Sequence, residues 1–306
     1  MRIAIIDIGT NTTRLFIAEV ADGILRREFT RISRVTRLGA GVDAHGRLSP
    51  EALVREHAVL ADYAEQIAKA EVPRTVAVMT SAVRDAADGS QFAAEVAARH
   101  GWETHVLSGD AEADLTYRGA TDVIDPASTE RILVVDIGGG STELVLGRGV
   151  SADFHVSTQA GVVRQSDRHL SADPPAVAEL DRLRADVRAT LAAGVPGPRR
   201  RGVQRTLAVA GTPTSLAAID LALEPYDPAA THGHRLARAR VEELLAQLLE
   251  MSVEQRRTLA GLHPDRAGVI IPGTAILLEV MALFNLAEVE VSEHDILRGA
   301  ALTYGS

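Results

Sequence analysis

Two stretches of the chain read almost alike: IAIIDIGTNTTRLF at residues 3–16 and ILVVDIGGGSTELV at residues 132–145. Aligned without gaps, Asp7 falls on Asp136, and the glycine and threonine that follow each aspartate are also in register. Each stretch contains a β-rich run, a short turn with glycine and a second β-rich run, a pattern that predicts a β-hairpin. Because an internal repeat decides architecture, we expect two domains of the same core topology.

Helical and strand patterns alternate through the rest of the chain, which predicts an α/β fold. The turn-rich sequence TDVIDPASTE at residues 121–130 precedes the second hairpin and marks the domain boundary. We therefore expect one domain at residues 1–122 and a second at residues 123–306, with the alternative that the last helix packs back on the first domain. The expected helices cover residues 50–70, 91–100, 176–193, 213–223, 239–251, 272–284 and 294–302, and the further strands cover residues 75–80, 103–107, 206–210 and 288–291.

The composition of the chain excludes several classes of protein. With 306 residues, 46% of them hydrophobic, the chain is long enough to bury the cores of two domains. It has no cysteine, which excludes disulfides and thiolate sites, and its net charge of −9 argues against a general nucleic-acid or anionic-membrane surface. No apolar run approaches the roughly 20 residues that span a bilayer, and no signal-peptide pattern opens the chain, so we expect a cytoplasmic protein.

The hairpin turns have the chemistry of phosphate sites. Glycines permit close backbone approach, adjacent N–H groups bind anions, and hydroxyls add donors, while the leading aspartate, Asp7 or Asp136, orients water or Mg²⁺. One such turn is weak evidence, but two in register are specific. A third loop, between a strand and a helix at residues 211–212, is a further anion site. The candidate phosphate-binding residues are Gly9, Thr10, Asn11, Thr12, Gly138, Gly139, Gly140, Ser141, Thr142, Gly211 and Thr212. The P-loop and dinucleotide-binding motifs are absent.

With these loops, the chain resembles the exopolyphosphatases and guanosine pentaphosphate phosphohydrolases in their short, two-domain form. The resemblance covers essentially the whole chain and implies the fold of the superfamily that contains actin, hexokinase and acetate kinase. That fold has two actin-like (ribonuclease H-like) domains with a cleft between them. The further matching segments are TSAVR at 80–84, LSGDAEADL at 107–115, Gly211-Thr212, GLHPDR at 261–266 and LRGA at 297–300.

The resemblance also assigns roles. It implies that Glu112 is the general base and that Arg84 is the catalytic arginine. Mg²⁺ would be held by Asp136 and Glu143, with Asp7 as the remaining metal candidate. Two departures from the family pattern, Ala111 in place of a glutamate and Gly268 in place of an aspartate, leave the effect of those positions open.

The function expected is an Mg²⁺-dependent exopolyphosphatase, which releases orthophosphate from inorganic polyphosphate by water attack. The alternative is hydrolysis of guanosine pentaphosphate, which also presents a terminal phosphoanhydride. An ATP-dependent small-molecule kinase is disfavoured because Glu112 would serve water rather than a hydroxyl acceptor, and an actin-like filament is disfavoured by the catalytic set. A homodimer is left open. Since larger members carry further helical domains, short polyphosphates are expected to be handled at least as well as long ones.

Overall fold

The repeated sequences form two β-hairpins in the computed structural model, which describes residues 1–305. In the first, β1 (Arg2–Ile8) pairs with β2 (Thr12–Ala21); in the second, β6 (Arg131–Ile137) pairs with β7 (Thr142–Arg148). Both hairpins are antiparallel, and each has a short turn, at residues 9–12 and 138–142, whose last residue begins the second strand. The predicted hairpins are therefore confirmed.

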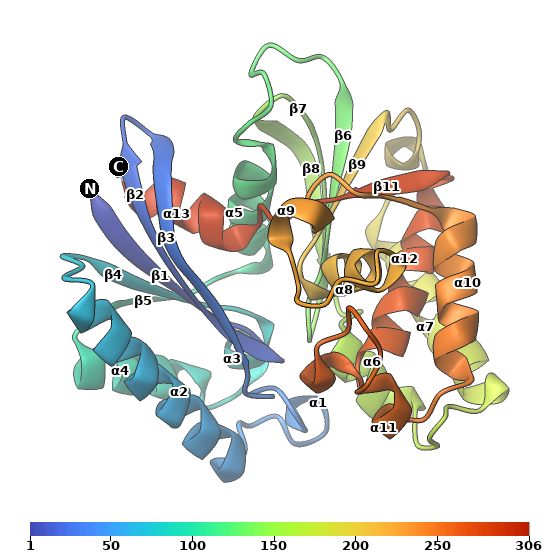
Figure 1. Ribbon diagram of the computed structural model, residues 1–306, viewed down its shortest axis with the longest axis horizontal. Coiled ribbons are helices and arrows are strands. Elements are labelled where there is room, and N and C mark those ends of the chain that lie inside the picture. The colour runs from blue at the N-terminus through green and yellow to red at the C-terminus, as the bar shows by residue number, and fades with distance from the viewer. Residues whose placement is uncertain (306) are drawn as a thin grey trace. The chain divides into compact units, whose positions relative to one another are not determined.

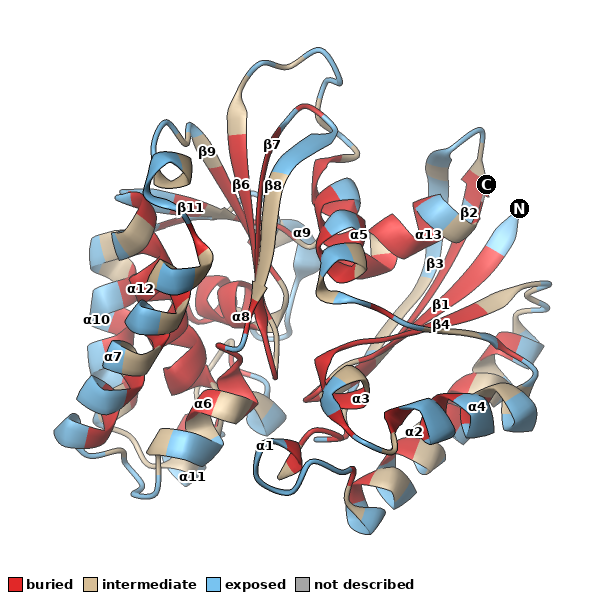
Figure 2. Cartoon of the chain, turned by 180° about the vertical axis from the view of Figure 1, so that it is seen from behind, coloured by how far each residue is buried: buried red, intermediate tan, exposed pale blue. Residues whose placement is uncertain are grey.

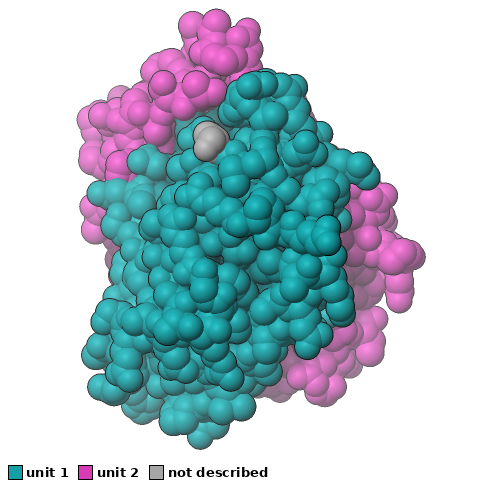
Figure 3. Space-filling model, turned by 90° about the vertical axis from the view of Figure 1, so that its left-hand side faces the viewer, with its two compact units in different colours: residues 1–122, 294–306 teal, residues 123–293 magenta. Residues whose placement is uncertain are grey.

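The chain divides into two units (Figure 3). The first contains Met1–Asp122 and the chain from His294 onward, and the second contains Val123–Glu293. This division falls at the boundary expected from the sequence. The last helix packs against helix α5 (Gly109–Thr121) of the first unit, which is the alternative that the sequence left open, and the second unit ends at Glu293.

In the first unit, β1, β2 and β3 (Ile24–Val35) run antiparallel, and β4 (Thr75–Met79) and β5 (Glu103–Val106) extend the sheet in parallel to β1. The strand order is β3-β2-β1-β4-β5. The helices of this unit are α1 (Val42–His45), α2 (Pro50–Lys69), α3 (Ser81–Asp85), α4 (Gly89–His100), α5 (Gly109–Thr121) and α13 (Ile296–Tyr304).

Alternation along β1 divides the core of the first unit between the two faces of its sheet. Ile6 and Ile8 belong to the cluster under α2 and α4, whereas Ile3 and Ile5 belong to the cluster under α5 and α13. Figure 1 shows the two helix layers on opposite faces of this sheet. Asp7 has the same parity as Ile3 and Ile5, so it points toward the face that α5 and α13 cover.

The second unit repeats this plan. Its sheet has the order β10-β11-β9-β6-β7-β8, in which β6, β7 and β8 are antiparallel while β6, β9 and β11 are parallel. The remaining strands are β8 (Ser151–Thr158), β9 (Arg205–Val209), β10 (Arg235–Ala237) and β11 (Glu288–Val291). The helices are α6 (Val162–His169), α7 (Val177–Gly194), α8 (Gly211–Asp220), α9 (Pro228–Thr231), α10 (Arg238–Leu249), α11 (Val253–Arg256) and α12 (Ile270–Phe284), with 3₁₀ turns at Gly197–Arg200 and Pro264–Arg266.

Burial follows these layers. The central strands β1 and β6 are buried along nearly their whole length, and α12 is buried all round (Figure 2). Leu133, Val135 and Ile137 of β6 pack with α7, α8, α10 and α12 in one core. Each unit thus has its own hydrophobic core.

Two sheets with matching strand order and an antiparallel second strand define the actin-like fold, which confirms the expected class. The third strand of each sheet, β3 and β8, was not predicted. Both are edge strands of largely polar sequence in which at most one residue is buried, so they lack the apolar alternation of a buried strand. Among residues 1–305, no helix is both long and apolar enough to cross a bilayer.

Candidate active site

The first candidate phosphate turn joins β1 to β2. Gly9 N–H donates to the Thr12 carbonyl at 3.1 Å and closes the turn. The chain that follows β3 donates to the other carbonyls: Thr36 N–H bonds to Asn11 O at 3.1 Å and Gly39 N–H to Thr10 O at 2.8 Å. A side chain at Gly39 would meet the Thr10 methyl at 2.2 Å, so this close approach requires glycine.

The turn of the second hairpin is held in the same way. Gly138 N–H donates to Ser141 O at 3.0 Å, and the start of α6 supplies Val162 N–H to Gly138 O at 2.9 Å. A Cβ on Gly161 would lie 2.2 Å from the Gly140 carbonyl carbon, so glycine is again needed where two backbones meet. In both units the neighbouring segment engages carbonyls of the turn. This arrangement directs those carbonyls away from any anion that the turn would bind.

The hydroxyls of the turns are less available than the sequence suggested. Thr142 is fully buried and donates to the Ala160 carbonyl at 2.5 Å, so its hydroxyl holds the hairpin rather than a ligand. Asn11 Nδ2 donates to Thr12 Oγ1 at 3.3 Å, which leaves the hydrogen of that hydroxyl for another acceptor.

The third loop connects β9 to α8. Its leading residue, Ala210, has φ 68° and ψ −170°, a conformation that is rare for a residue with a side chain. A Cβ on Gly211 would lie 1.5 Å from Arg266 Nη1, so the guanidinium packs directly on the loop. Sequence reasoning gave Arg266 no role, although the residue belongs to the GLHPDR segment. Thr212 packs against Gly273 of α12, where an added Cβ would meet Thr212 Oγ1 at 2.3 Å.

The structure brings Glu112 and Arg84 together in the first unit. α5 begins directly after β5, with Ser108 as N-cap accepting from Ala111 N–H at 3.2 Å, and Glu112 therefore lies in its first turn. Arg84 Nη1 donates to Glu112 Oε2 at 2.7 Å and to the Leu107 carbonyl at 3.0 Å. Arg84 Nε lies 3.7 Å from Asp85, so its main ionic partner is the candidate base.

Burial determines the acidity of Glu112. The residue is 7% exposed, and burial raises its pKa from the ordinary 4.5 to about 7, against the lowering effect of the Arg84 guanidinium. The carboxylates of Asp7 and Asp85 add a smaller raising effect. A carboxyl group that titrates near neutral pH suits proton transfer.

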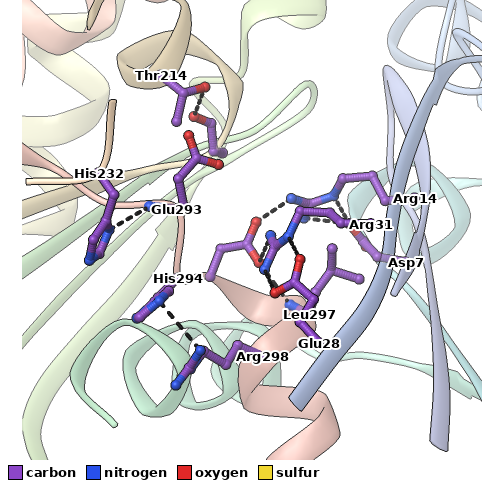
Figure 4. A network of polar contacts seen from close by, with 12 residues as sticks. Asp7, Arg14, Glu28, Arg31, Thr214, His232, Glu293, His294, Leu297 and Arg298 are labelled. Carbon is purple, nitrogen blue, oxygen red and sulfur yellow. Dashed lines mark hydrogen bonds and ion pairs between the residues drawn. The ribbon is translucent and has the colours of Figure 1, made fainter. Parts of the chain in front are cut away.

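Asp7 has an arginine partner that the sequence analysis did not name. Arg14, opposite Asp7 in the hairpin register, donates to Asp7 Oδ2 from Nε at 2.8 Å and from Nη2 at 2.6 Å (Figure 4). The same guanidinium also bonds to Asp295, which caps α13 through Leu297 N–H at 3.1 Å. Arg31 lies 3.8 Å from Asp295. The hairpin register alone could have predicted the Asp7 pair.

At the position equivalent to Arg14, the second hairpin carries a carboxylate. Asp136 on β6 lies opposite Glu143 on β7, as Asp7 lies opposite Arg14. Both acidic side chains are buried, and Glu143 Oε1 accepts a hydrogen bond from Ser157 at 2.7 Å. The residues from 1 to 305 contain no cluster of three or more His, Asp or Glu with metal-binding geometry. The chain thus supplies a pair of carboxylates, a set that suits Mg²⁺ because this ion retains water and phosphate ligands.

The predicted site residues therefore form one group in each unit. The first contains Asp7, the turn at residues 9–12, Arg84 and Glu112. The second contains Asp136, the turn at residues 138–142 and Glu143, and the loop at residues 211–212 follows the strand that pairs with β6. The cleft expected between the domains stays a prediction.

Two actin-like units with glycine turns and buried carboxylates define a class of phosphate-handling proteins, and comparison with known proteins identifies the group within it. The profile of the Ppx/GppA phosphatase family matches residues 16–301. The chain belongs to this family, as the sequence predicted, and is a hydrolase.

The relatives agree along the whole chain. The protein is 40% identical to "Exopolyphosphatase 2" of Mycobacterium tuberculosis, over 99% of this chain and 98% of that one. A crystal structure of an exopolyphosphatase-like protein superposes with a TM-score of 0.91 at 33% identity, covering 100% of this chain and 99% of the other. The Ppx/GppA family member of Aquifex aeolicus superposes with a TM-score of 0.82 at 30% identity, covering 99% of this chain and 97% of that one.

Proposed function

We propose that the protein is an exopolyphosphatase that hydrolyses the terminal phosphoanhydride of inorganic polyphosphate. The observation that carries the proposal is the pairing of Glu112 with Arg84, which joins a base that titrates near neutral pH to a fixed cation. The full-length similarity to an exopolyphosphatase supports polyphosphate as the substrate.

The reaction is an in-line displacement. Ionised Glu112 accepts a proton from the attacking water while the oxygen of that water bonds to the terminal phosphorus. The bridging P–O bond breaks, its electron pair stays on the leaving chain, and orthophosphate is released. Arg84 Nη1 supplies the bonds to Leu107 and Glu112, and Nη2 is the donor that we assign to an oxygen of the transferred phosphate.

The turns supply the remaining contacts. Since carbonyls at residues 10–11 and 138–139 accept bonds from neighbouring backbone, the amide groups of the turns are the donors that we assign to phosphate oxygens. The guanidinium of Arg266, packed on Gly211, adds positive charge at the third loop.

Asp136 and Glu143 are the residues that would hold Mg²⁺. Two adjacent buried carboxylates fit the ion, which when bound would neutralise charge on the phosphate oxygens. Asp7 fits less well, because its Oδ2 already accepts two bonds from Arg14. We therefore assign Asp7 to the orientation of water or of Arg14 rather than to the metal.

Guanosine pentaphosphate is the second candidate substrate, because the matching family includes GppA and this nucleotide also ends in a phosphoanhydride. Orthophosphate release from polyphosphate and from guanosine pentaphosphate, at equal concentrations of terminal phosphate and with Mg²⁺, distinguishes the two. A higher kcat/KM for polyphosphate is expected. The proposal fails if neither substrate yields orthophosphate, or if the protein instead transfers phosphate from ATP to a small-molecule acceptor.

A further inference from the structure

A buried carboxyl group that the proposed reaction does not use lies beneath the first phosphate turn. Glu56, on α2, is completely buried. Thr13 Oγ1 lies 2.8 Å from both of its carboxyl oxygens, and the Thr13 and Thr36 hydroxyls are 3.3 Å apart. Thr36 also hydrogen-bonds to Glu56 through its side chain. One carboxyl group therefore connects two threonines that are distant in sequence.

These threonines flank the turn itself. Thr13 follows the turn directly and pairs with Ile8 on the other side of the hairpin. Thr36 N–H donates to the Asn11 carbonyl at the tip of the turn, at 3.1 Å. A continuous path of hydrogen bonds thus leads from Glu56 both to the residue that follows the turn and to the tip of the turn.

Helix α2 supports the same path at two further points. Arg55 Nε donates to the Thr36 carbonyl at 2.9 Å, and the Tyr63 hydroxyl donates to the Thr13 carbonyl at 2.9 Å. α2 is fixed in turn by the Ser49 N-cap and by its buried residues Ala52 and Leu60. The turn is therefore attached to a rigid helix rather than to a mobile loop.

We propose that Glu56 is a positioning residue that holds the turn at residues 9–12 in the geometry that binds the terminal phosphate. The inference rests on the proposed function of that turn. Burying a carboxyl group costs free energy unless its hydrogen bonds are satisfied, and an apolar side chain would fill the same space without that cost. An apolar side chain, however, cannot hydrogen-bond to the hydroxyls of Thr13 and Thr36, and so it cannot hold the backbone amides of the turn in place.

The test compares Glu56→Leu with Glu56→Gln. Leucine fills much of the space but leaves both threonine hydroxyls without the carboxyl group, whereas glutamine can accept from one and donate to the other. For Glu56→Leu we expect KM for polyphosphate to rise roughly tenfold with kcat changed by less than about threefold, since substrate binding is what a misplaced turn loses. Glu56→Gln should return KM to within about threefold of wild type.

Ile67→Ala is the matched control. It removes core packing from the same helix, away from the threonines, and should lower stability without changing KM. If Glu56→Leu does not fold, Thr36→Val breaks the same path with almost no change of shape and should raise KM similarly. A KM equal to that of wild type in the folded Glu56→Leu or Thr36→Val protein would overturn the inference, and so would a KM in Glu56→Gln as high as that in Glu56→Leu.

Amide hydrogen exchange separates this inference from the proposed function. In Glu56→Leu, a peptide covering residues 9–12 should exchange faster than in wild type, whereas in Ile67→Ala it should exchange at the rate of the wild type relative to the rest of the first unit. If wild-type protein releases no orthophosphate but the turn loosens in Glu56→Leu, the proposed function fails and the positioning role stands. Unchanged exchange in Glu56→Leu would refute the positioning role whatever the activity.

Discussion

Glu143 occupies in the second hairpin the position that Arg14 occupies in the first. Each residue lies opposite the aspartate of its own hairpin, in the same antiparallel register. The first hairpin therefore pairs its aspartate with a guanidinium, whereas the second places a carboxylate opposite its aspartate. Because a pair of carboxylates suits Mg²⁺, we propose that the two halves of the duplicated frame have different tasks.

Metal dependence should follow this difference. Asp136→Asn or Glu143→Gln should raise the Mg²⁺ concentration for half-maximal orthophosphate release by roughly tenfold or more, because each removes a ligand. Asp7→Asn, the matched change in the first hairpin, should shift that concentration less. Mg²⁺ activation curves for the three variants measure these shifts. An equal or larger shift in Asp7→Asn would show that Asp7 is a ligand of the metal.

The base can be tested by replacing its carboxyl group alone. Glu112→Gln keeps the shape and can still accept a bond from Arg84, so kcat should fall by roughly 10² to 10⁴ while KM changes little. Asp114→Asn, an exposed carboxylate on the same helix, should leave kcat near the wild-type value. Steady-state kinetics of the two variants measures both values of kcat. Retention of more than about a third of kcat in Glu112→Gln would exclude Glu112 as the base.

The pKa of Glu112 gives a pH prediction. Because its folded pKa is raised to about 7, the carboxyl group is increasingly protonated below that pH, and kcat/KM should fall about tenfold for each unit of further acidification. Arg84 lowers this pKa, so Arg84→Gln should move the acid limb to higher pH, and Arg84→Lys, which keeps the charge, should move it less. A pH profile that is flat between pH 5 and 7, roughly the window between the ordinary and the raised pKa, would contradict the assignment.

Backbone contact at the second turn predicts a steric effect. Gly161→Ala would place a Cβ 2.2 Å from the Gly140 carbonyl carbon, and the clash should lower unfolding free energy by about 1–3 kcal/mol. Gly197→Ala is the control, because an added Cβ there meets no atom within 4 Å. Urea unfolding measures both. Equal midpoints would show that the turn and the start of α6 can separate without cost.

Strain at the third loop predicts the opposite effect. Ala210 has a positive φ, so Ala210→Gly should relieve strain and raise unfolding free energy by about 1 kcal/mol, less the entropy that glycine adds to the unfolded chain. The urea midpoint of Ala210→Gly should be higher than that of the wild type or equal to it. A clear loss of stability would mean that the methyl group contributes more by packing than the conformation costs.

Local sequence patterns were enough to predict the duplicated hairpins, the α/β class and the family. These features depend on residues within one strand, turn or helix, where apolar spacing and glycine position fix the backbone. The motifs that carry the family resemblance also singled out Glu112 and Arg84, whose catalytic roles stay predictions. Strands β3 and β8 were missed because their largely polar sequences, with at most one buried residue each, carry little of that local signal.

The contacts between side chains that are distant in sequence depend on the tertiary structure. Asp295 reaches Arg14 across 281 residues because α13 packs on the first sheet, and Glu56 reaches Thr13 across 43 residues because α2 covers the other face. Arg266 lies on Gly211 for the same kind of reason. The physical cause is that a local pattern fixes which face a side chain occupies, whereas its partner depends on which element packs against that face and in what register.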